Sequence, residues 1–415
     1  MLKRVSLQKI QKIIKYLKRS IAEWIPETTN TDYWNVRGQP TKQTNLRRLD
    51  MLYVNFIEGG NIEEVFFENI TKDTKTPKLS FVYFTDDYDS KQLYQLSQKH
   101  LNHMCFIGAC VPGIVVNNRL IRSGVAVFVI DDPNIEAFTY LQKNLSQQPY
   151  SGGEDVGKFV TQKASSGTVF VLPDGFASNV SEFLRGMHNF LGSDFNYIGG
   201  GSGDNLKFYK TYQFTNDGIE SDSAAIAVIK DSKFKLGAEH GWEPQTLPLT
   251  VTHAEGKVVY ELDGIPAFKR YAEVVDGVNK ENFPYYGMKS PLGIPIADNS
   301  FLIRDPIMVN EDDSITFVTE IPNNTMAVVM DGEVNKLINA SEKTITDTSN
   351  SGSAIFLFEC ISRYLLMEEA FQEELDRIVS AADGIPVIGI LSFGEVSSVT
   401  GVPLLYNKTT AVAVS

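Results

Sequence analysis

A short apolar run ends in a polar turn at Thr168-Val169-Phe170-Val171-Leu172-Pro173-Asp174, a pattern typical of a buried strand. Two other stretches share this layout, namely Ser80-Phe81-Val82-Tyr83-Phe84-Thr85-Asp86 and Ala354-Ile355-Phe356-Leu357-Phe358-Glu359-Cys360. Each run is followed by a helical pattern, at residues 91–101, 181–191 and 368–381. The sequence therefore predicts a strand–helix module that occurs three times.

Each predicted helix leads to a second strand that ends in Ile-Gly, in Phe106-Ile107-Gly108, Tyr197-Ile198-Gly199 and Val387-Ile388-Gly389. A further glycine follows in each copy, then a strand pair or hairpin, and then a strand of small residues at 125–129, 224–228 and 410–414. A right-handed crossover makes the first two strands parallel, so the polar turn and the glycine turn lie at one sheet edge, where open α/β sheets bind ligands. We predict a mixed α/β fold, in which repeated β-α-β units with antiparallel tails form mixed sheets.

The region between the second and third copies has a different pattern. It contains a hairpin signal at 249–252 and 257–262, a helical segment at 267–275, and strands at 301–304, 314–319 and 326–329. We expect four parts: a basic helix at 1–25, a linker or extension at 26–57, an α/β domain with two repeats at 58–233, and a domain at 234–415 that ends in the third repeat. The expected ligand pocket lies between the last two domains.

Composition and charge restrict the class of protein. The chain has 415 residues, with 38 Lys and Arg against 51 Asp and Glu and a net charge of −13, which argues against a nucleic-acid binder. Its three cysteines do not form a disulfide framework or a four-thiolate zinc site, so we expect a reducing, cytoplasmic setting. No apolar stretch of about 18 residues is present to span a membrane.

The first 25 residues form an expected amphipathic helix that is strongly basic. Glu23 is the one acidic residue of this segment, and its basic residues are Lys3, Arg4, Lys9, Lys12, Lys15, Lys18 and Arg19. Such a helix binds an anionic membrane surface or a groove on a partner protein, or it packs on the acidic body of its own chain.

The glycine cluster at 199–204 is the first candidate binding site. Glycines let backbone N–H groups converge on a ligand, and we count Gly199, Gly200, Gly201, Ser202 and Asp204 as ligand-binding candidates. No Gly-Lys-Ser/Thr follows, so the cluster is not a Walker loop, and a strand-like segment rather than a helix follows, so it is not a dinucleotide fingerprint. The structural alternative is a set of tight turns.

His240, Trp242 and Arg304 are further ligand-binding candidates. Imidazole hydrogen-bonds a ligand, coordinates a metal or ligates haem iron; an indole stacks on a ligand; and a guanidinium clamps a carboxylate. The structural alternatives are a packed His-Trp pair and an Arg-Asp pair that fixes a strand end.

Cys360, Ser392 and Glu395 lie in the turns of the third copy and complete the candidate set, with Cys110 in the first copy. Nothing beside the thiols indicates the base that a cysteine nucleophile needs, so we assign no catalytic residue. His100, His103 and Cys105 have a metal-like spacing but lack a fourth partner, and we predict no metal site.

These same residues resemble a known family. The stretches at 197–204, 211–214, 240–242 and 258–264 are similar to the FIST sensory domain, and those at 291–295, 302–306 and 394–410 are similar to its FIST C-terminal partner domain. The first copy departs from the family pattern, with Gly108-Ala109-Cys110-Val111-Pro112-Gly113 in place of a Gly-Cys-Ser/Thr-rich turn.

The resemblance implies an intracellular, non-enzymatic sensory protein of signal transduction that binds a small ligand such as an amino acid and acts through a partner such as a histidine kinase. One alternative is a haem-binding nitric-oxide sensor with His240 as the axial ligand. The other is a hydrolytic enzyme that uses Cys360 or Ser392.

Overall fold

The computed structural model describes residues 44–49, 52–296, 300–349 and 352–415. These residues form two compact units. The first, the repeat unit, comprises residues 44–205, 209–241 and 334–415; the second, the inserted unit, comprises Trp242–Glu333 together with Leu206–Phe208. The expected basic helix at 1–25 lies outside the described residues.

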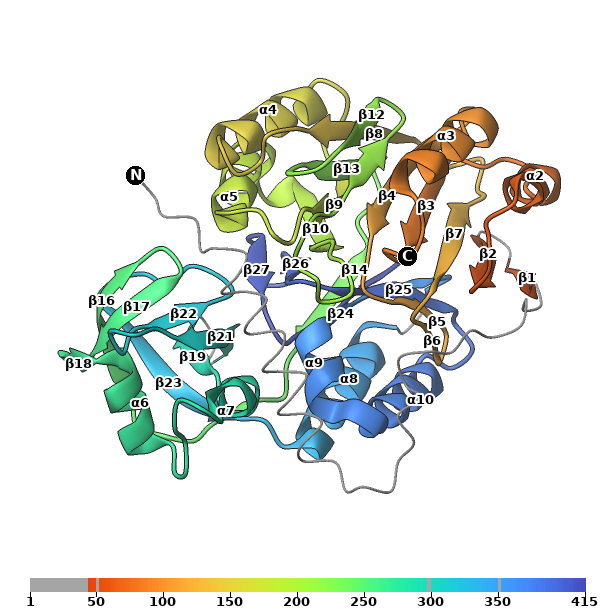
Figure 1. Cartoon of the computed structure of the whole chain (residues 1–415). Coiled ribbons are helices and arrows are strands. Elements are labelled where there is room, and N and C mark those ends of the chain that lie inside the picture. The colour runs from red at the N-terminus through yellow and green to blue at the C-terminus, as the bar shows by residue number, and fades with distance from the viewer. Residues whose placement is uncertain (1–43, 50–51, 297–299, 350–351) are drawn as a thin grey trace. The chain divides into compact units, whose positions relative to one another are not determined.

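The repeat unit contains the three predicted modules (Figure 1). Their first strand, helix and second strand are β3 (Leu79–Phe84), α3 (Ser90–His100) and β4 (Cys105–Cys110); β9 (Gly167–Pro173), α5 (Val180–Leu191) and β10 (Phe195–Gly200); and β24 (Ile355–Cys360), α10 (Phe371–Ala381) and β25 (Val387–Ser392). The two strands are parallel in every module. An antiparallel strand of small residues then pairs with the first strand, and these tails are β7 (Gly124–Ile130), β13 (Ala224–Lys230) and β28 (Thr410–Val414). The predicted mixed α/β fold is confirmed.

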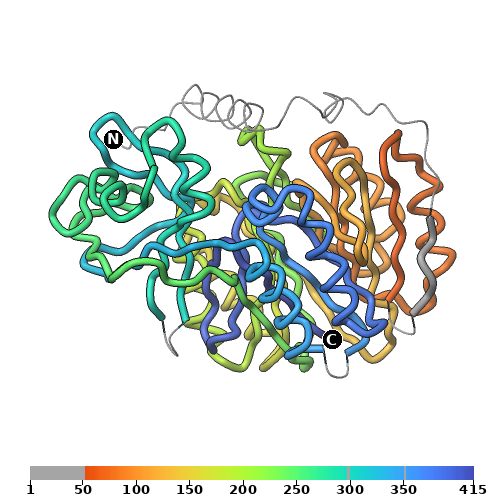
Figure 2. Tube along the Cα trace, turned by 90° about the horizontal axis from the view of Figure 1, so that it is seen from below, coloured from red at the N-terminus to blue at the C-terminus, as the bar shows by residue number. Residues whose placement is uncertain are grey.

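Each copy begins earlier than the sequence pattern indicated, with a further strand and a helix. These elements are β2 (Leu52–Glu58) and α2 (Glu64–Asp73); β8 (Ala137–Gln142) and α4 (Pro149–Thr161); and β14 (Lys235–Glu239) and α8 (Val334–Thr348). Part of the expected linker is therefore sheet, because β2 pairs with β7 and with β1 (Thr44–Leu49). The third copy is interrupted between β14 and α8 by the inserted unit, and Figure 2 follows the trace, which is green where it leaves β14 and blue where it returns at α8.

The hairpin of each copy joins the sheet of another copy. The hairpins are β5 (Ile114–Val116) with β6 (Arg119–Ile121), β11 (Gln213–Thr215) with β12 (Gly218–Glu220), and β26 (Glu395–Ser397) with β27 (Leu404–Tyr406). The first hairpin pairs with β25 of the third copy, the second with β4 of the first, and the third with β10 of the second. The exchange is cyclic, so each sheet is completed by a neighbour.

The core of the repeat unit has one phenylalanine from each copy at its centre. Phe81, Phe170 and Phe356 lie on the first strands of the three modules and are at most 3% exposed. Their ring centroids are 4.9 Å apart for Phe81 and Phe170, 5.3 Å for Phe81 and Phe356, and 5.1 Å for Phe170 and Phe356. The three sheets therefore share one aromatic contact.

The third module has a helix that the sequence pattern did not predict. The chain turns directly from β24 into α9 (Ile361–Met367), then passes through a short 3-10 helix (Glu368–Ala370) into α10. Our predicted helix began at 368, because an apolar segment that follows a strand without turn residues gives no start signal. A second short 3-10 helix, Gly192–Asp194, follows α5.

The inserted unit is a nine-stranded sheet with two helices. The predicted hairpin is present as β16 (Leu249–Glu255) and β17 (Val258–Leu262), and the predicted helix as α6 (Ala267–Val274). The remaining elements are α7 (Phe283–Lys289), β15 (Glu243–Pro244), β18 (Ile265–Pro266), β19 (Leu292–Pro295), β20 (Phe301–Arg304), β21 (Pro306–Val309), β22 (Ile315–Phe317) and β23 (Thr325–Asp331). In the described part of the chain, no helix is both long enough and apolar enough to cross a bilayer.

Truncation of the central aromatic contact tests this account of the core. We expect Phe170→Ala to lower the free energy of unfolding by about 3–5 kcal/mol, because the cavity opens where three sheets meet. The matched control is Phe190→Ala, whose ring is 40% exposed and whose loss should cost about 1 kcal/mol. Urea titration followed by circular dichroism measures both; equal losses would contradict the central role of Phe170.

Candidate functional site

The turns that follow the second strands of the three modules meet one another. The Gly203 amide donates to the Cys110 carbonyl at 3.0 Å, which joins the second copy to the first. Gly201 N donates to Gly394 O at 2.8 Å, which joins the second copy to the third, and Leu391 N donates to Gly113 O at 2.9 Å, which joins the third to the first. The carboxyl ends of strands from all three copies therefore converge, and we take this junction as the candidate site.

We call the turns that follow β4, β10 and β25 the first, second and third corners. The glycines of the second corner are required by close contacts within the protein. A Cβ atom would lie 1.8 Å from Val171 O at Gly199, 2.7 Å from Ser392 Cβ at Gly200, and 2.2 Å from Phe393 O at Gly201. No side chain fits at such separations. These contacts favour the structural interpretation of the glycine cluster, in which the missing side chains let strands from two copies approach.

Three positions after the first strands are equivalent. In each copy a backbone amide there donates to a carbonyl oxygen at the start of the tail strand. The bonds are Thr85 N to Gly124 O at 3.0 Å, Asp174 N to Ser223 O at 2.8 Å, and Cys360 N to Thr409 O at 3.3 Å. Asp174 is nearly buried, and its carboxylate accepts from the backbone amides of Phe176 and Asp222, both at 2.9 Å. Burial raises the pKa of Asp174, while these amides lower it. Asp174 is thus a structural acid that fixes two turns.

Ser202 and Asp204 also have local partners. Ser202 Oγ donates to Pro173 O at 3.1 Å and lies 3.1 Å from Thr211 Oγ1. Gln213 Nε2 donates to Thr211 Oγ1 at 2.7 Å, and Asp204 Oδ2 accepts from the Tyr209 amide at 2.8 Å. These bonds hold the loop that leaves the second corner.

Cys360, Ser392 and Glu395 come together in the third copy. Ser392 Oγ lies 2.9 Å from Glu395 Oε1, the Thr409 amide donates to Glu395 Oε2 at 3.3 Å, and the Cys360 thiol also hydrogen-bonds this carboxyl. Burial raises the pKa of Glu395 to about 8, because the three hydrogen bonds only partly offset the cost of an ionised carboxyl there. Glu395 is therefore mostly protonated at neutral pH. The sequence analysis selected all three residues.

Arg363 is the hub of a buried ionic network next to this group. Its Nε lies 2.6 Å from Glu359 Oε1, its Nη2 pairs with Glu374 Oε1, and all three side chains are fully buried. Burial, together with the neighbouring Glu374 carboxylate, raises the pKa of Glu359 well above its usual range. Among the described residues, Glu359 Oε2 and Glu374 Oε2 accept no hydrogen bond.

The same guanidinium joins the two segments of the repeat unit that flank the insertion. Arg363 Nη1 donates to His240 O at 2.6 Å, where the chain leaves β14, and Nη2 donates to Leu337 O at 2.9 Å, where the chain has returned in α8. Our sequence analysis missed Arg363 because it did not predict α9. The available signal was the pair of opposite charges, Glu359 and Arg363, in an otherwise apolar segment.

A second arginine, Arg122, lies at the same sheet end and was also missed. It stands between β6 and β7; its Nη2 donates to Asn205 Oδ1 at 2.7 Å, and its guanidinium carbon lies 4.6 Å from the centre of the Tyr364 ring. The signal in the sequence was its place, two residues before the tail strand of the first copy.

Two further ligand-binding candidates, Trp242 and Arg304, are held by hydrogen bonds to backbone carbonyls. Trp242 and Arg304 belong to the inserted unit, where Trp242 Nε1 donates to Lys289 O at 3.0 Å and Arg304 Nε donates to Glu320 O at 3.2 Å. Burial lowers the pKa of Arg304 to about 10. These bonds are those of packed side chains that fix strand and helix ends.

The surroundings of His240 do not fit a haem. Its carbonyl is held by Arg363, and a Cβ at the adjoining Gly241 would lie 2.6 Å from Lys336 O, so α8 packs against this turn. The preceding residue, Glu239, pairs with Lys343 at 2.6 Å. A haem needs an apolar slot beside its axial ligand, and we derive no step through one.

The histidines with metal-like spacing have other roles. His100 Nε2 lies 2.9 Å from Glu64 Oε1, and its ring stacks on Phe67; the Cys105 thiol donates to Ala137 O at 3.3 Å. Within the described ranges, no group of three or more His, Cys, Asp or Glu residues is arranged to hold a metal ion.

The protonated state of Glu395 predicts a pH dependence. Its pKa in the folded protein, about 8, exceeds the ordinary value of 4.5, so the folded state binds the extra proton between these values and stability falls as pH rises through them. We expect a loss of about 5 kcal/mol across this window, since each pKa unit corresponds to about 1.4 kcal/mol. Glu395→Gln should flatten this dependence, because a neutral amide replaces the neutral carboxyl; Glu373→Gln on the exposed face of α10 is the control. Urea unfolding at several pH values measures it, and an unchanged slope in Glu395→Gln would contradict the assignment.

Comparison with known proteins identifies both halves of the chain. Residues 78–265 match the FIST N domain, and residues 267–398 match the FIST C domain. The chain is 29% identical over 195 residues to an uncharacterized protein of Methanocaldococcus jannaschii, a match that covers 42% of this chain and 37% of that protein. It is 22% identical over 187 residues to uncharacterized proteins of Mycobacterium bovis and Mycobacterium tuberculosis, over 42% of this chain and 48% of each relative.

The chain thus spans less than half the length of the curated relatives that it matches. The two domain models meet inside the inserted unit, between β17 and α6, and the second continues through α8 to β26. Because they follow each other in order and together take in most of the sequence, the protein belongs to the FIST family of sensory-domain proteins.

Proposed function

We propose that this protein is a non-enzymatic sensor that binds a small ligand at the junction of its three repeats and passes the signal to a partner protein. FIST domains are associated with sensory signal transduction and ligand binding. The observation that carries the proposal is the convergence of the three corners, in which every pair of copies is joined by a backbone hydrogen bond. Ligand contact there reaches all three sheets at once.

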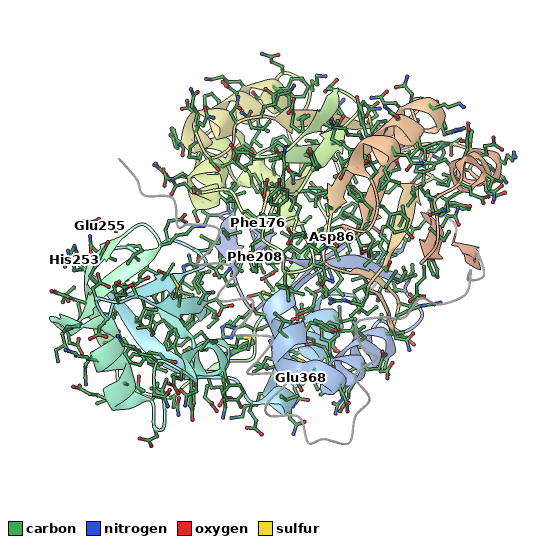
Figure 3. The ribbon with its side chains drawn as sticks, viewed as in Figure 1. Asp86, Phe176, Phe208, His253, Glu255 and Glu368 are labelled. Carbon is green, nitrogen blue, oxygen red and sulfur yellow. The ribbon has the colours of Figure 1, made fainter. Side chains whose placement is uncertain are left out.

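Helix α9 supports a route from this junction to the rest of the chain. Consecutive residues of α9 carry Tyr364, which stacks with Arg122, and Arg363, which joins the two segments that flank the insertion. The helix ends at Met367, and the next residue, Glu368 (labelled in Figure 3), has a φ of 52°, in the region that favours glycine. A small shift of α9 would therefore change both contacts together, and a ligand that favours one position of α9 would shift the population of states.

The geometry does not favour the hydrolytic alternative. Cys360 is 3% exposed and Ser392 is fully buried. Burial raises the pKa of their shared neighbour Glu395 to about 8, so only a small fraction of this carboxyl is ionised at neutral pH and able to accept a proton from a nucleophile. The thiol and hydroxyl serve as hydrogen-bonding partners of that carboxyl.

The remaining parts of the proposal come from the family resemblance and from charge. We propose that the ligand is a small molecule such as an amino acid, that the partner is a signalling protein such as a histidine kinase, and that the protein works in the cytoplasm. The net charge of −13 supports a role away from nucleic acid. The basic segment at 1–25 is a candidate contact for the partner or for a membrane surface.

A ligand screen with hydrogen exchange tests the sensor. We expect one member of a panel of amino acids and small organic acids to raise the melting temperature. At a hundredfold excess over its Kd, the ligand should add about 2.7 kcal/mol to the free energy of unfolding. The same ligand should slow amide exchange in α9, at residues 236–241 and at 334–341, with α4 as the internal control. A panel without any stabilising member, or protection confined to the inserted unit, would sink the proposal.

Thiol labelling separates the sensor from the enzyme. We expect iodoacetamide at neutral pH to modify Cys360 no faster than Cys110, since both thiols are only 3% exposed. Mass spectrometry of the peptides gives both rates from one sample. Labelling of Cys360 more than about tenfold faster would indicate a reactive thiolate and favour a catalytic role.

A further inference from the structure

One terminal nitrogen of Arg122 has a hydrogen-bond partner and the other is buried without one. Its Nη2 donates to Asn205 Oδ1 at 2.7 Å, and the guanidinium carbon lies 4.6 Å from the centre of the Tyr364 ring. Its Nη1 is out of contact with solvent, and no residue in the described part of the chain accepts a hydrogen bond from it. A desolvated donor without an acceptor costs free energy, so the position is one that an acceptor from outside the chain would stabilise.

The residues around Arg122 come from all three copies. Arg122 precedes the tail strand of the first copy, Asn205 follows the glycine corner of the second, and Tyr364 lies on α9 of the third. The stacking contact and the Asn205 bond fix the plane of the guanidinium before anything binds. A fork that is already oriented loses little conformational entropy on binding, so the arrangement is that of a built site.

The charges nearby select the acceptor. Asp86 Oδ2 accepts from the Asn205 amide at 3.3 Å (Figure 3), and Asp204 is the preceding residue. Two carboxylates that contact or adjoin Asn205, the hydrogen-bond partner of Arg122, leave little positive potential there for a dianion such as phosphate. A carboxylate carries a single charge, and its two oxygens match the planar fork of arginine.

We propose that Arg122 is a carboxylate-binding residue of this protein, held ready by Tyr364 and Asn205, and that its ligand is a small carboxylic acid. This inference rests on the proposed sensor and names the chemical class of its ligand. It also explains how binding would affect the rest of the protein, because the Tyr364 ring that contacts the guanidinium belongs to α9, the helix that carries Arg363.

Acetate is the probe for the test, and inorganic phosphate at equal ionic strength is the second arm. We expect the side-chain Nε–H signal of Arg122 in a 15N spectrum of the whole chain to shift saturably with acetate and to respond at least tenfold more weakly to phosphate. Arg122→Gln should lower the acetate affinity, read from the amide shifts of residues 203–205, at least tenfold. Arg122→Lys, which keeps the charge but not the fork, should show an intermediate loss.

The matched control is Arg119→Gln, on the same hairpin, where Arg119 pairs with Glu58 and lies over the Phe56 ring. It should leave the acetate response unchanged. The proposal is overturned if wild type shows no saturable response to acetate, if phosphate binds as well as acetate, or if Arg122→Gln responds like wild type. If Arg122→Gln does not fold, Arg122→Lys decides: an affinity equal to that of wild type overturns the proposal, and a loss supports it.

The failures of the site and of the sensor can be told apart. If acetate shifts the Arg122 signal without changing amide hydrogen exchange at residues 236–241 and 334–341, the carboxylate site is supported and the proposed sensor function is contradicted. A ligand that changes those segments and binds Arg122→Gln as tightly as wild type supports the sensor and overturns the assignment of Arg122.

Discussion

The contact among Phe81, Phe170 and Phe356 is the constraint on which the rest of the repeat unit depends. Three sheets can share one core only where their first strands come together, and each of these strands contributes one ring whose centroid lies within 5.3 Å of both others. The cyclic exchange of hairpins then fixes the order of the copies, since each sheet is completed by a strand from another. Packing at the centre and pairing at the edges thus impose the same arrangement, and the corners meet as a consequence.

Burial of Arg363 is the second constraint, and it explains how a segment as long as the inserted unit can interrupt a repeat. A buried guanidinium is tolerated only when carboxylates and carbonyls surround it, and the loss of one partner from such a pair costs about 3–5 kcal/mol. Two of its acceptors, His240 O and Leu337 O, belong to the segments on either side of the insertion. The interrupted copy therefore stays closed around one side chain, and whatever moves α9 acts on both segments.

The modules could be predicted from sequence because strand, helix and turn signals are local. The three-residue strands β5, β11 and β26 are too short to indicate which strands they pair with. The exchange of hairpins between copies could therefore not be predicted from sequence. Cys360, Ser392 and Glu395 were found because they are polar residues at or just beyond the ends of predicted strands. Arg122 and Arg363 were missed for a physical reason: the sequence shows the charge of a side chain, but its hydrogen-bonding partners come from strands and helices that are distant in the chain.

The differences between the copies indicate where function lies in a repeated fold. At equivalent positions after the first strand the copies have Thr85, Asp174 and Cys360, so the scaffold accepts different chemistry at each corner. Around Asp174 the polar groups satisfy one another, which is what structure alone requires. Around Arg122 and Glu359 a donor and an acceptor lack partners among the described residues. Burying such groups costs free energy that a ligand or a change of state would offset. Arg122 contacts α9, and Glu359 belongs to β24, the strand that leads into this helix.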